Sequence, residues 1–360
     1  MSAFRYSCPD TCRPPQCFCP RPDPPGGLSP AHTPQFVLLS FDDAVDQKIF
    51  DFVHPIFTHI KNPNGCPISA TFFITTDYSD YWLIERLSRE GHEIAVHTMT
   101  HKTNEKTDLK TWRAEIIGAR DAFAKLSQIS KDKIIGFRAP FLHHNKESFQ
   151  VVFDEHFLYD SSVTETVGYL SKDPLSRIWP YTLDYGIAQR CFVGICPEKA
   201  FPGLFEIPLY AWSEKNGQEK VAMDPLGSRE EIRDLLLRNF RDRLRGNRAP
   251  FCVFLHGQWL QDEGHRAALL DLLDEATKER DVWFVSLTQL IEFMRRPKPS
   301  AEVGSLFQCP SNPSGPEICD GRDNDGNGEV DEGLVHECRY PEGSFRTCAP
   351  CPTVWPTVRK

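Results

Sequence analysis

The segment FVLLSFDDAVD, residues 36–46, joins a run of mostly apolar residues to two adjacent aspartates, Asp42 and Asp43. The apolar run predicts a buried strand. The aspartates have two interpretations. They could cap the helix that comes next, because carboxylates accept hydrogen bonds from the free backbone N–H groups of a first helical turn. Alternatively, both carboxylates could lie at the end of the strand and take part in a reaction there.

The alternation of strand and helix continues along the chain. A loop-rich insertion interrupts it at about 164–228. Six or seven such units predict a parallel sheet that either closes into a barrel or stays open. The expected strands cover 35–41, 70–75, 92–97, 134–140, 157–163, 250–257 and 282–287, and the expected helices cover 46–60 with a break at Pro55, 81–91, 109–128, 146–156, 229–246 and 265–281.

Polar residues whose side chains could take part in a reaction fall where the predicted strands end. They are Asp42, Asp43, His97, Arg138 and His256. Because α/β barrels place their active sites at the carboxyl ends of the strands, the sequence predicts a site on that face.

The composition limits the class of protein. The chain has 360 residues, 40% hydrophobic and 25% charged, which suits one large α/β domain with a small appendage. Its net charge of −9 offers no basic field for nucleic acid, so we expect no nucleic-acid partner. No apolar stretch reaches the ~20 residues of a membrane span. The first residues lack a signal-peptide core, so a secreted protein would have lost its leader.

The 13 cysteines gather at the two ends of the chain. Such density around short Pro-rich segments favours disulfides in an oxidising compartment, with a zinc knuckle at each end as the alternative. Cys252, inside an apolar run, is the candidate for the odd free thiol. We expect four segments: a Cys/Pro-rich arm at 1–34, a catalytic domain at 35–296, a linker at 297–308 and a Cys-rich tail at 309–360.

Two histidines and one carboxylate form a three-ligand zinc site that leaves a position open for water. His97 and His101, four residues apart, can share one metal, and one of the two aspartates can join them while the other deprotonates the water. Arg138 could hold a catalytic carboxylate ionised, or make an ordinary ion pair. His256 could protonate a leaving amine, or be a core histidine.

Taken together, these motifs resemble the polysaccharide deacetylases of carbohydrate esterase family 4. The matching segments are SFDDA, HTMTH, RAPF, the region of YDSS and WPYTLDY, and LHGQW. Residues 8–296 resemble more narrowly the arthropod chitin deacetylase group, as in GHEIAVHTMTH and NRAPFCVFLHGQWL. The resemblance implies a distorted (β/α)7-type barrel.

The resemblance also implies a role for each matched residue. Asp42 would be the base, supported by Arg138, and His256 the acid. Zn²⁺, or another divalent transition metal, would be held by Asp43, His97 and His101. The backbone N–H of Phe141 would stabilise the oxyanion, and Leu255 and Trp259 would shape the acetyl pocket. Trp179 and Asp160 lie in the least well matched motif. Trp179 would form a wall of the substrate groove, and Asp160 would be the partner of a catalytic side chain. A disulfide between Cys191 and Cys196 would close a loop over the groove.

The tail segment CDGRDNDGNGEVDEG, 319–333, has the oxygen-rich rhythm of a calcium loop without the final Glu of an EF-hand. It resembles the calcium-stabilised repeats of secreted proteins, and a disordered acidic tail held by disulfides is the alternative. The expected ligands of a structural Ca²⁺ are Asp323, Asp325, Asn327 and Asp331, with Asp320 and Glu332 as further candidates.

These observations favour a secreted, zinc-dependent hydrolase that removes N-acetyl groups from chitin or a related N-acetylglucosamine polymer. An O-acetyl esterase acting on xylan or another glycan would use the same residues. A non-catalytic chitin-binding protein with a vestigial site is the third alternative, and it predicts a missing ligand or base.

Overall fold

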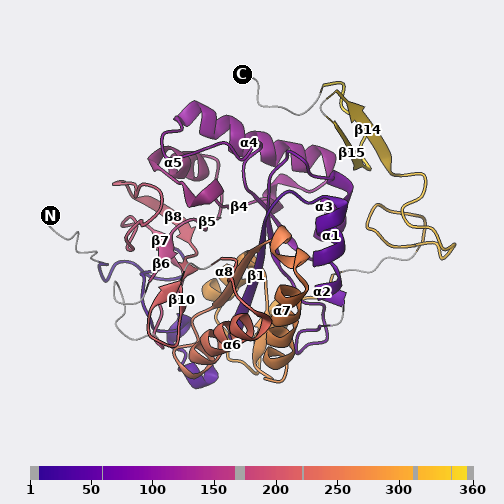
Figure 1. Ribbon diagram of the computed structural model, residues 1–360. Coiled ribbons are helices and arrows are strands. Elements are labelled where there is room, and N and C mark those ends of the chain that lie inside the picture. The colour runs from indigo at the N-terminus through magenta and orange to yellow at the C-terminus, as the bar shows by residue number, and fades with distance from the viewer. Residues whose placement is uncertain are drawn as a thin grey trace.

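The computed structural model describes residues 8–58, 60–166, 175–220, 223–310, 315–341 and 343–354. Strand β1 (Gln35–Asp43) lies at the centre of the fold (Figure 1). It pairs in parallel with β12 (Phe251–His256) on one side and with β2 (Thr71–Ile74) on the other. Every residue of β1 except Asp43 is buried. Both faces of the strand therefore lie in the core, which explains its nearly continuous apolar sequence.

The central sheet has nine strands, and their order shows how the fold is closed. The main path runs β12-β1-β2-β3-β4-β5-β8-β7, and β13 (Val282–Phe284) pairs with the first residues of β1. Among the described strands of this sheet, only β7 and β8 pair antiparallel. In the part of the chain that the structure describes, β7 does not pair with β12, so the sheet curls like a barrel but stays open. The predicted α/β architecture is confirmed. The bounds not yet given are β3 (Glu93–Val96), β4 (Gly136–Phe137), β5 (Tyr159–Asp160), β7 (Tyr181–Leu183) and β8 (Phe201–Glu206).

Helices follow most strands and cover the outside of the sheet (Figure 1). The predicted break at Pro55 is confirmed: one helix ends at Val53 and a short one begins at Pro55, because proline has no N–H to continue the ladder. The helices are α1 (Gln47–Val53), α2 (Pro55–Thr58), α3 (Tyr81–Arg89), α4 (Leu109–Leu126), α5 (Lys146–Asp154), α6 (Arg229–Arg245), α7 (Glu263–Ala276) and α8 (Leu287–Arg295).

The insertion at 164–228, expected to be loop-rich, supplies the last two strands of the main sheet, β8 and β7. β7 has three residues and β8 has six. The position of β8 in the sheet is fixed because it pairs with both β5 and β7. The insertion also holds two small pairs, β6 (Thr164–Glu165) with β9 (Leu209–Tyr210), and β10 (Trp212–Ser213) with β11 (Glu219–Lys220). Part of the insertion, 167–174 and 221–222, lies outside the described residues.

Twelve of the cysteines form disulfides, and Cys252 is free and buried as predicted. The cysteines of the arm pair with one another, as do four of those in the tail. Disulfides, and not zinc knuckles, thus fasten both ends. The pairs are Cys8–Cys19, Cys12–Cys17, Cys66–Cys309, Cys191–Cys196, Cys319–Cys348 and Cys338–Cys351.

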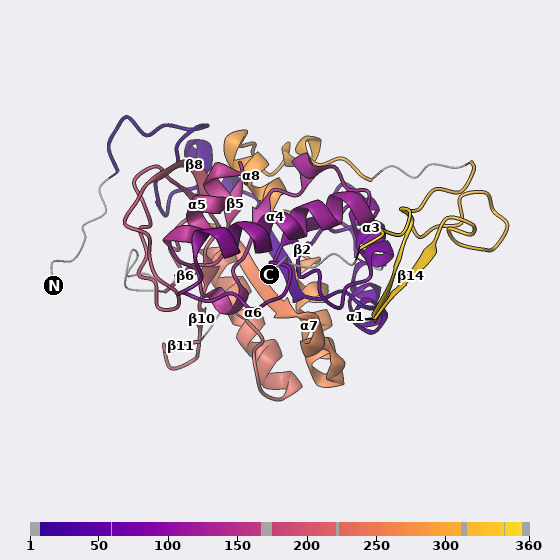
Figure 2. The same cartoon turned by 90° about the horizontal axis from the view of Figure 1, so that it is seen from above.

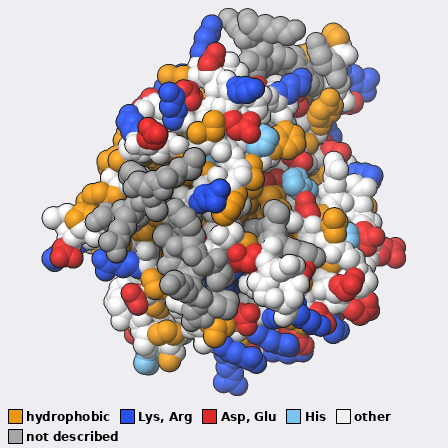
Figure 3. All heavy atoms as spheres, turned by 60° about the vertical axis from the view of Figure 1, so that its left-hand side comes forward, with side chains coloured by type: hydrophobic (Ala, Val, Ile, Leu, Met, Phe, Trp, Pro, Cys, Tyr) orange, Lys and Arg blue, Asp and Glu red, His pale blue; other side chains and the backbone are white. Residues whose placement is uncertain are grey.

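The N-terminal arm and the C-terminal tail lie on opposite sides of the sheet (Figure 2). The arm runs beside β7, where the Thr182 N–H donates to Phe18 O at 2.9 Å. The tail forms the hairpin of β14 (His336–Tyr340) and β15 (Gly343–Thr347) next to α3. On the face in Figure 3, acidic and basic side chains are scattered among uncharged ones, and basic side chains gather at its lower edge.

Candidate active site

The polar residues predicted at strand ends converge at the carboxyl edge of the sheet. Asp42 and Asp43 end β1, His97 follows β3, Arg138 follows β4, and His256 ends β12. The register pairs Asp42 directly with His256. Because neighbouring parallel strands end at the same edge, residues far apart in sequence meet there.

Asp43, His97 and His101 place their ligand atoms within 4.8 Å of one another. Asp43 Oδ1 lies 3.7 Å from His97 Nε2 and 3.2 Å from His101 Nε2. Asp43 and His101 both have positive φ, 83° and 57°, a conformation that non-glycine residues rarely adopt. The backbone is therefore turned at these two positions so that all three side chains point to one place.

A divalent metal fits these three residues. Asp43 Oδ1 is buried and has no hydrogen-bond donor among the described residues, which is costly unless a cation faces it. The His97 Nδ1 lies 2.8 Å from the carbonyl oxygen of Arg138, which fixes the ring and leaves Nε2 for a metal. Burial lowers the pKa of His97 to about 3, so its imidazole is neutral, as a ligand must be.

Asp42, the neighbouring carboxylate, is held by Arg138 instead. Arg138 Nη1 donates to Asp42 Oδ1 at 2.6 Å, and both side chains are almost fully buried. The same guanidinium donates to Ser40 Oγ at 3.0 Å and to the carbonyl and hydroxyl oxygens of Ser161 at 2.8 and 3.0 Å. Burial raises the pKa of Asp42 above its ordinary value, while the charge of Arg138 acts in the opposite direction.

His256 lies on the other side of the aspartates, with Nε2 4.0 Å from Asp43 Oδ2. Its partner is Asp224, which the sequence analysis missed: one Asp224 oxygen contacts His256 Nδ1 and the other accepts the His256 N–H at 2.9 Å. Burial lowers the pKa of His256, but the bond to Asp224 and the nearby aspartates together raise it to about 9. Asp224 lies in the insertion, and its sequence, an Asp before a Pro, suggests only a turn.

The expectation that Asp160 serves as partner of a catalytic side chain stays a prediction; its hydrogen bonds in the described part of the chain are with Ser162 and Glu206. Asp160 is buried and accepts from the Ser162 N–H and hydroxyl, both at 2.9 Å. It lies opposite Glu206 in the β5–β8 pairing. Asp184, in the insertion, accepts from the Gly203 N–H at 3.2 Å.

The alternation of β12 decides which of its residues face the site. Phe254 and His256 face the barrel interior, since the Phe254 ring lies 4.4 Å from the Arg138 guanidinium. Leu255 therefore points the other way, into the layer between sheet and helices, together with its register partner Phe41. The prediction that Leu255 shapes the acetyl pocket is wrong for this reason.

Trp259 is buried, and its indole donates to Pro225 O at 2.9 Å, next to Asp224. It fixes the loop that carries Asp224. The adjacent Gly257 allows close packing against α1: a Cβ there would lie 2.4 Å from Ile49 Cγ2. A side chain at 257 would thus push the segment that follows His256 away from α1.

Trp179 lies away from the candidate site. It is only 2% exposed, and its ring packs 6.3 Å from that of Phe293, which in turn contacts Phe36 at the opposite end of β1 from the aspartates. The prediction that Trp179 forms a groove wall is therefore wrong. Trp179 belongs to the core beneath the N-terminal arm, where its backbone N–H donates to Arg21 O at 2.9 Å.

A cavity of about 380 Å³ opens beside the aspartates. Asp42, Asp43 and His101 line it together with Asp77 and Tyr78 of the β2–α3 loop. Tyr78 is 87% exposed. The Phe141 ring packs 4.4 Å from the His101 ring and is 62% exposed. The cavity thus has a polar lining beside the exposed Tyr78 ring, and a second exposed aromatic ring, that of Phe141, contacts its His101.

The disulfide loop Cys191–Cys196 is anchored near this face. The Ile195 N–H donates to His144 O at 2.8 Å, and His144 follows the segment that carries Phe141. Phe192 and Ile195 project from the loop, each 55% exposed. The predicted disulfide is confirmed, and the place of this loop over a substrate groove stays a prediction.

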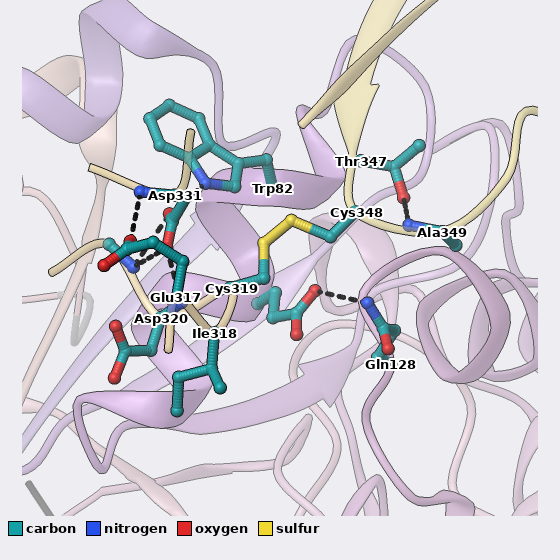
Figure 4. The surroundings of a disulfide bond; sticks show 12 residues. Trp82, Gln128, Glu317, Ile318, Cys319, Asp320, Asp331, Thr347, Cys348 and Ala349 are labelled. Carbon is teal, nitrogen blue, oxygen red and sulfur yellow. Dashed lines mark hydrogen bonds between the residues drawn. A yellow bond between two sulfur atoms is a disulfide. The ribbon is translucent and has the colours of Figure 1, made fainter. Parts of the chain in front are cut away.

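The predicted calcium ligands of the tail do not all face one point. Asp331 is fully buried, and its two oxygens accept from the N–H groups of Asp320 and Gly321 and from the indole of Trp82 (Figure 4). It is therefore a docking residue and not a calcium ligand, a correction to the predicted set. Asp323 accepts from the backbone N–H groups of Gly326, Asn327 and Gly328, as a turn-forming aspartate does.

Three carboxylates of the tail, Glu317, Asp325 and Glu332, do lie within 4.8 Å of one another. Asn327, also in the predicted set, contacts both Asp325 and Glu332. Glu317 was not predicted, and it also accepts from the Asn324, Asp325 and Asp331 N–H groups. A structural Ca²⁺ in this loop stays a prediction.

Fold and site together define an α/β protein with a two-histidine, one-carboxylate cluster and a second carboxylate at the carboxyl ends of its strands. Residues 30–155 match the family model described as Polysaccharide deacetylase. Chitin deacetylase 8 of Bombyx mori is 30% identical over 303 residues, covering 81% of this chain and 78% of the relative. The chain belongs to the polysaccharide deacetylase family.

Other comparisons agree with this assignment. Chitin deacetylase 1 of Bombyx mori is 30% identical over 313 residues, 80% of this chain, and the chain spans 56% of that relative's length. The fold is similar to that of a Mycobacterium smegmatis protein assigned by name to the polysaccharide deacetylases, with a TM-score of 0.52, 17% identity and coverage of 84% of this chain and all of that one. A Pseudomonas aeruginosa PAO1 structure of the same designation gives a TM-score of 0.52 at 16% identity, covering 81% and 96%.

Proposed function

We propose that this protein is a metal-dependent deacetylase that hydrolyses N-acetyl groups of chitin or a related N-acetylglucosamine polymer. The observation that carries the proposal is the division of labour between adjacent carboxylates: Asp43 faces His97 and His101, while Asp42 is held by Arg138. The two Bombyx mori relatives, both named chitin deacetylases, support the choice of substrate.

Asp43, His97 and His101 would hold the metal, for which Zn²⁺ is the first candidate because two histidines and a carboxylate suit it. When bound, such an ion supplies Lewis acidity toward the acetyl carbonyl oxygen and lowers the pKa of water. The orphaned Asp43 oxygen and the neutral His97 ring support this assignment.

Asp42 would act as the base that removes a proton from the attacking water. Its raised pKa makes it a stronger base than an exposed carboxylate, and Arg138 keeps it ionised and oriented. Water oxygen then bonds to the acetyl carbon, and the backbone N–H of Phe141 would stabilise the oxyanion.

His256 would donate a proton to the nitrogen as the C–N bond breaks, giving acetate and a free amine on the sugar. Its pKa of about 9 keeps it protonated near neutral pH, so that it has a proton to give. Asp224 orients the imidazole by accepting from Nδ1.

The decisive experiment compares acetate release by the zinc-loaded protein from chitin oligosaccharides and from acetylated xylan. We expect release from chitin. Asp42→Asn should lower kcat by about 100-fold or more and retain zinc, because it removes the base but no ligand. Asp43→Ala, the matched control, should lose both zinc and activity.

Other outcomes discriminate the alternatives. Release from xylan alone would favour an O-acetyl esterase, for which the same carboxylates and metal serve. A protein that binds chitin and zinc but releases no acetate from either polymer would contradict the catalytic proposal. Turnover retained by Asp42→Asn would remove Asp42 from the role of base.

We also propose that the protein acts outside the cell. Its six disulfides suit an oxidising compartment and a polysaccharide substrate. Among the described residues, no helix combines the length and apolarity needed to cross a membrane.

A further inference from the structure

The C-terminal tail lies beyond the matched family region but is docked against α3, the helix that follows one of the loops lining the cavity. Asp331 accepts from the Trp82 indole at 2.7 Å, and the Phe345 ring packs 4.8 Å from Tyr81 (Figure 4 shows the Trp82 contact). The Cys66–Cys309 disulfide fastens the start of the tail. These contacts fix the tail in one position on the enzyme.

Arg346 of β15 makes the contacts that reach the candidate site. Its Nε donates to Asp80 Oδ2 at 2.6 Å, and its Nη2 donates to Gln47 Oε1 at 2.7 Å. The guanidinium carbon lies 4.3 Å from the centre of the Trp82 ring. Arg346 and Asp80 are 33% and 15% exposed, so water screens this ion pair only in part.

The two partners of Arg346 stand where two active-site loops pass into helices. Gln47 is the first residue of α1, directly after the loop that follows β1, and Asp80 caps α3, directly after the loop that carries Asp77 and Tyr78. Both loops line the cavity of about 380 Å³.

The same two loops also bond to each other through Val45. Its carbonyl accepts from the Asp80 N–H at 2.8 Å, and its N–H donates to Ser79 Oγ at 3.0 Å. Arg346 bridges the loops a second time, from outside. A planar guanidinium with two fixed donor directions sets the distance between its two acceptors, which a single contact cannot do.

We propose that Arg346 is a positioning residue of the active site, through which the C-terminal tail holds the β1–α1 and β2–α3 loops in register around the cavity. The consequence for catalysis rests on the proposed function; the consequence for loop order does not. Because a small displacement of Asp42 or Asp43 misaligns the base and the metal ligand, loosening these loops lowers turnover.

The test uses the full chain with Arg346→Ala, Arg346→Lys and, as matched control, Arg339→Ala. Arg339 belongs to the same hairpin, but its side chain is 77% exposed and its ion pair is with Glu337 of the tail itself. A fourth variant, Gln47→Ala, removes one arm of the bridge at an exposed position and leaves the Arg346–Asp80 pair in place.

The first readout is hydrogen–deuterium exchange of peptides covering 44–50 and 75–82. We expect Arg346→Ala to exchange faster than the wild type in both peptides. Gln47→Ala should exchange faster mainly in the 44–50 peptide, and Arg339→Ala should exchange as the wild type does in both. Arg346→Lys should exchange at an intermediate rate, since lysine keeps a positive charge beside Asp80 but lacks the two fixed donor directions of the guanidinium. Exchange equal to the wild type in Arg346→Ala would overturn the proposal.

The second readout is acetate release from chitin oligosaccharides. We expect about a five- to tenfold loss of kcat/KM in Arg346→Ala, carried mainly by kcat, with no loss in Arg339→Ala. Faster loop exchange with unchanged kcat/KM would overturn the positioning role. A wild-type protein that is inactive on every acetylated glycan, yet shows the expected exchange pattern, would refute the proposed function and leave the loop bridge standing.

Discussion

At the scale of single residues, Asp42 and Asp43 lie side by side but belong to different parts of the site. Asp42 continues the strand and points into the barrel interior, where Arg138 reaches it. Asp43 leaves the strand with a φ of 83°, which turns its carboxylate toward His97 and His101. One backbone turn thus separates the candidate base from the candidate metal ligand.

Asp224→Asn tests whether the partner of His256 matters for turnover. An amide at 224 can no longer hold the imidazolium by charge, so we expect kcat to fall by about 10- to 100-fold while zinc affinity is unchanged. Steady-state kinetics and chelator competition would measure the two quantities. The control is Asp184→Asn, whose carboxylate accepts only from the Gly203 N–H in the described contacts. Equal kinetics for the two variants would contradict the role of Asp224.

At the scale of elements, strand ends bring the site together and helix caps fix where each helix starts. Asp46 caps α1, Asp80 caps α3, and Ser286 forms a capping box with Gln289 at the start of α8. In the first two cases the cap directly follows an active-site loop. Helix starts on this side therefore limit how far the loops can move.

Ser286→Ala tests the energetic value of a cap that lies away from the candidate site. The Ser286 hydroxyl accepts from the Gln289 N–H at 3.2 Å, and Ala leaves that donor unsatisfied. We expect the free energy of unfolding to fall by about 1 kcal/mol for Ala and only a few tenths for Gly. Urea denaturation would measure both. A free energy of unfolding that is unchanged in Ser286→Ala would show that the side-chain bond does not stabilise α8.

At the scale of the whole molecule, the Cys66–Cys309 disulfide ties the start of the tail to the main domain, whereas the disulfides of the arm and of the rest of the tail lie within those segments. Cys66–Cys309 joins positions 243 residues apart, whereas Cys191–Cys196 closes a loop of separation 5. In the chain-entropy model, a crosslink stabilises mainly by restricting the unfolded chain, and more so for longer loops.

Replacing both cysteines of each pair by serine compares the two crosslinks. We expect a loss of about 5.5 kcal/mol in the free energy of unfolding without Cys66–Cys309 and about 2 kcal/mol without Cys191–Cys196. Chemical denaturation under oxidising conditions would measure the difference. A larger loss for the short loop would mean that native contacts of His144 with that loop, and not chain entropy, dominate.

The sequence by itself determined the α/β alternation and the cluster of Asp42, Asp43, His97, His101, Arg138 and His256. It could do so because strands and helices follow local periodicity, and because parallel strands present their carboxyl ends at one edge. The alternation of side chains along β12 also turns Leu255 away from the site, because Leu255 precedes His256 by one residue.

Only the tertiary structure decided the rest. Contacts between distant segments decide four features of the molecule. Asp224 holds His256, and Trp179 lies at the far end of the barrel. Asp331 binds Trp82 rather than a cation, and Arg346 reaches two active-site loops. The physical reason is that local periodicity fixes the direction of a strand or helix, whereas the partner of a loop side chain is set by how whole elements pack.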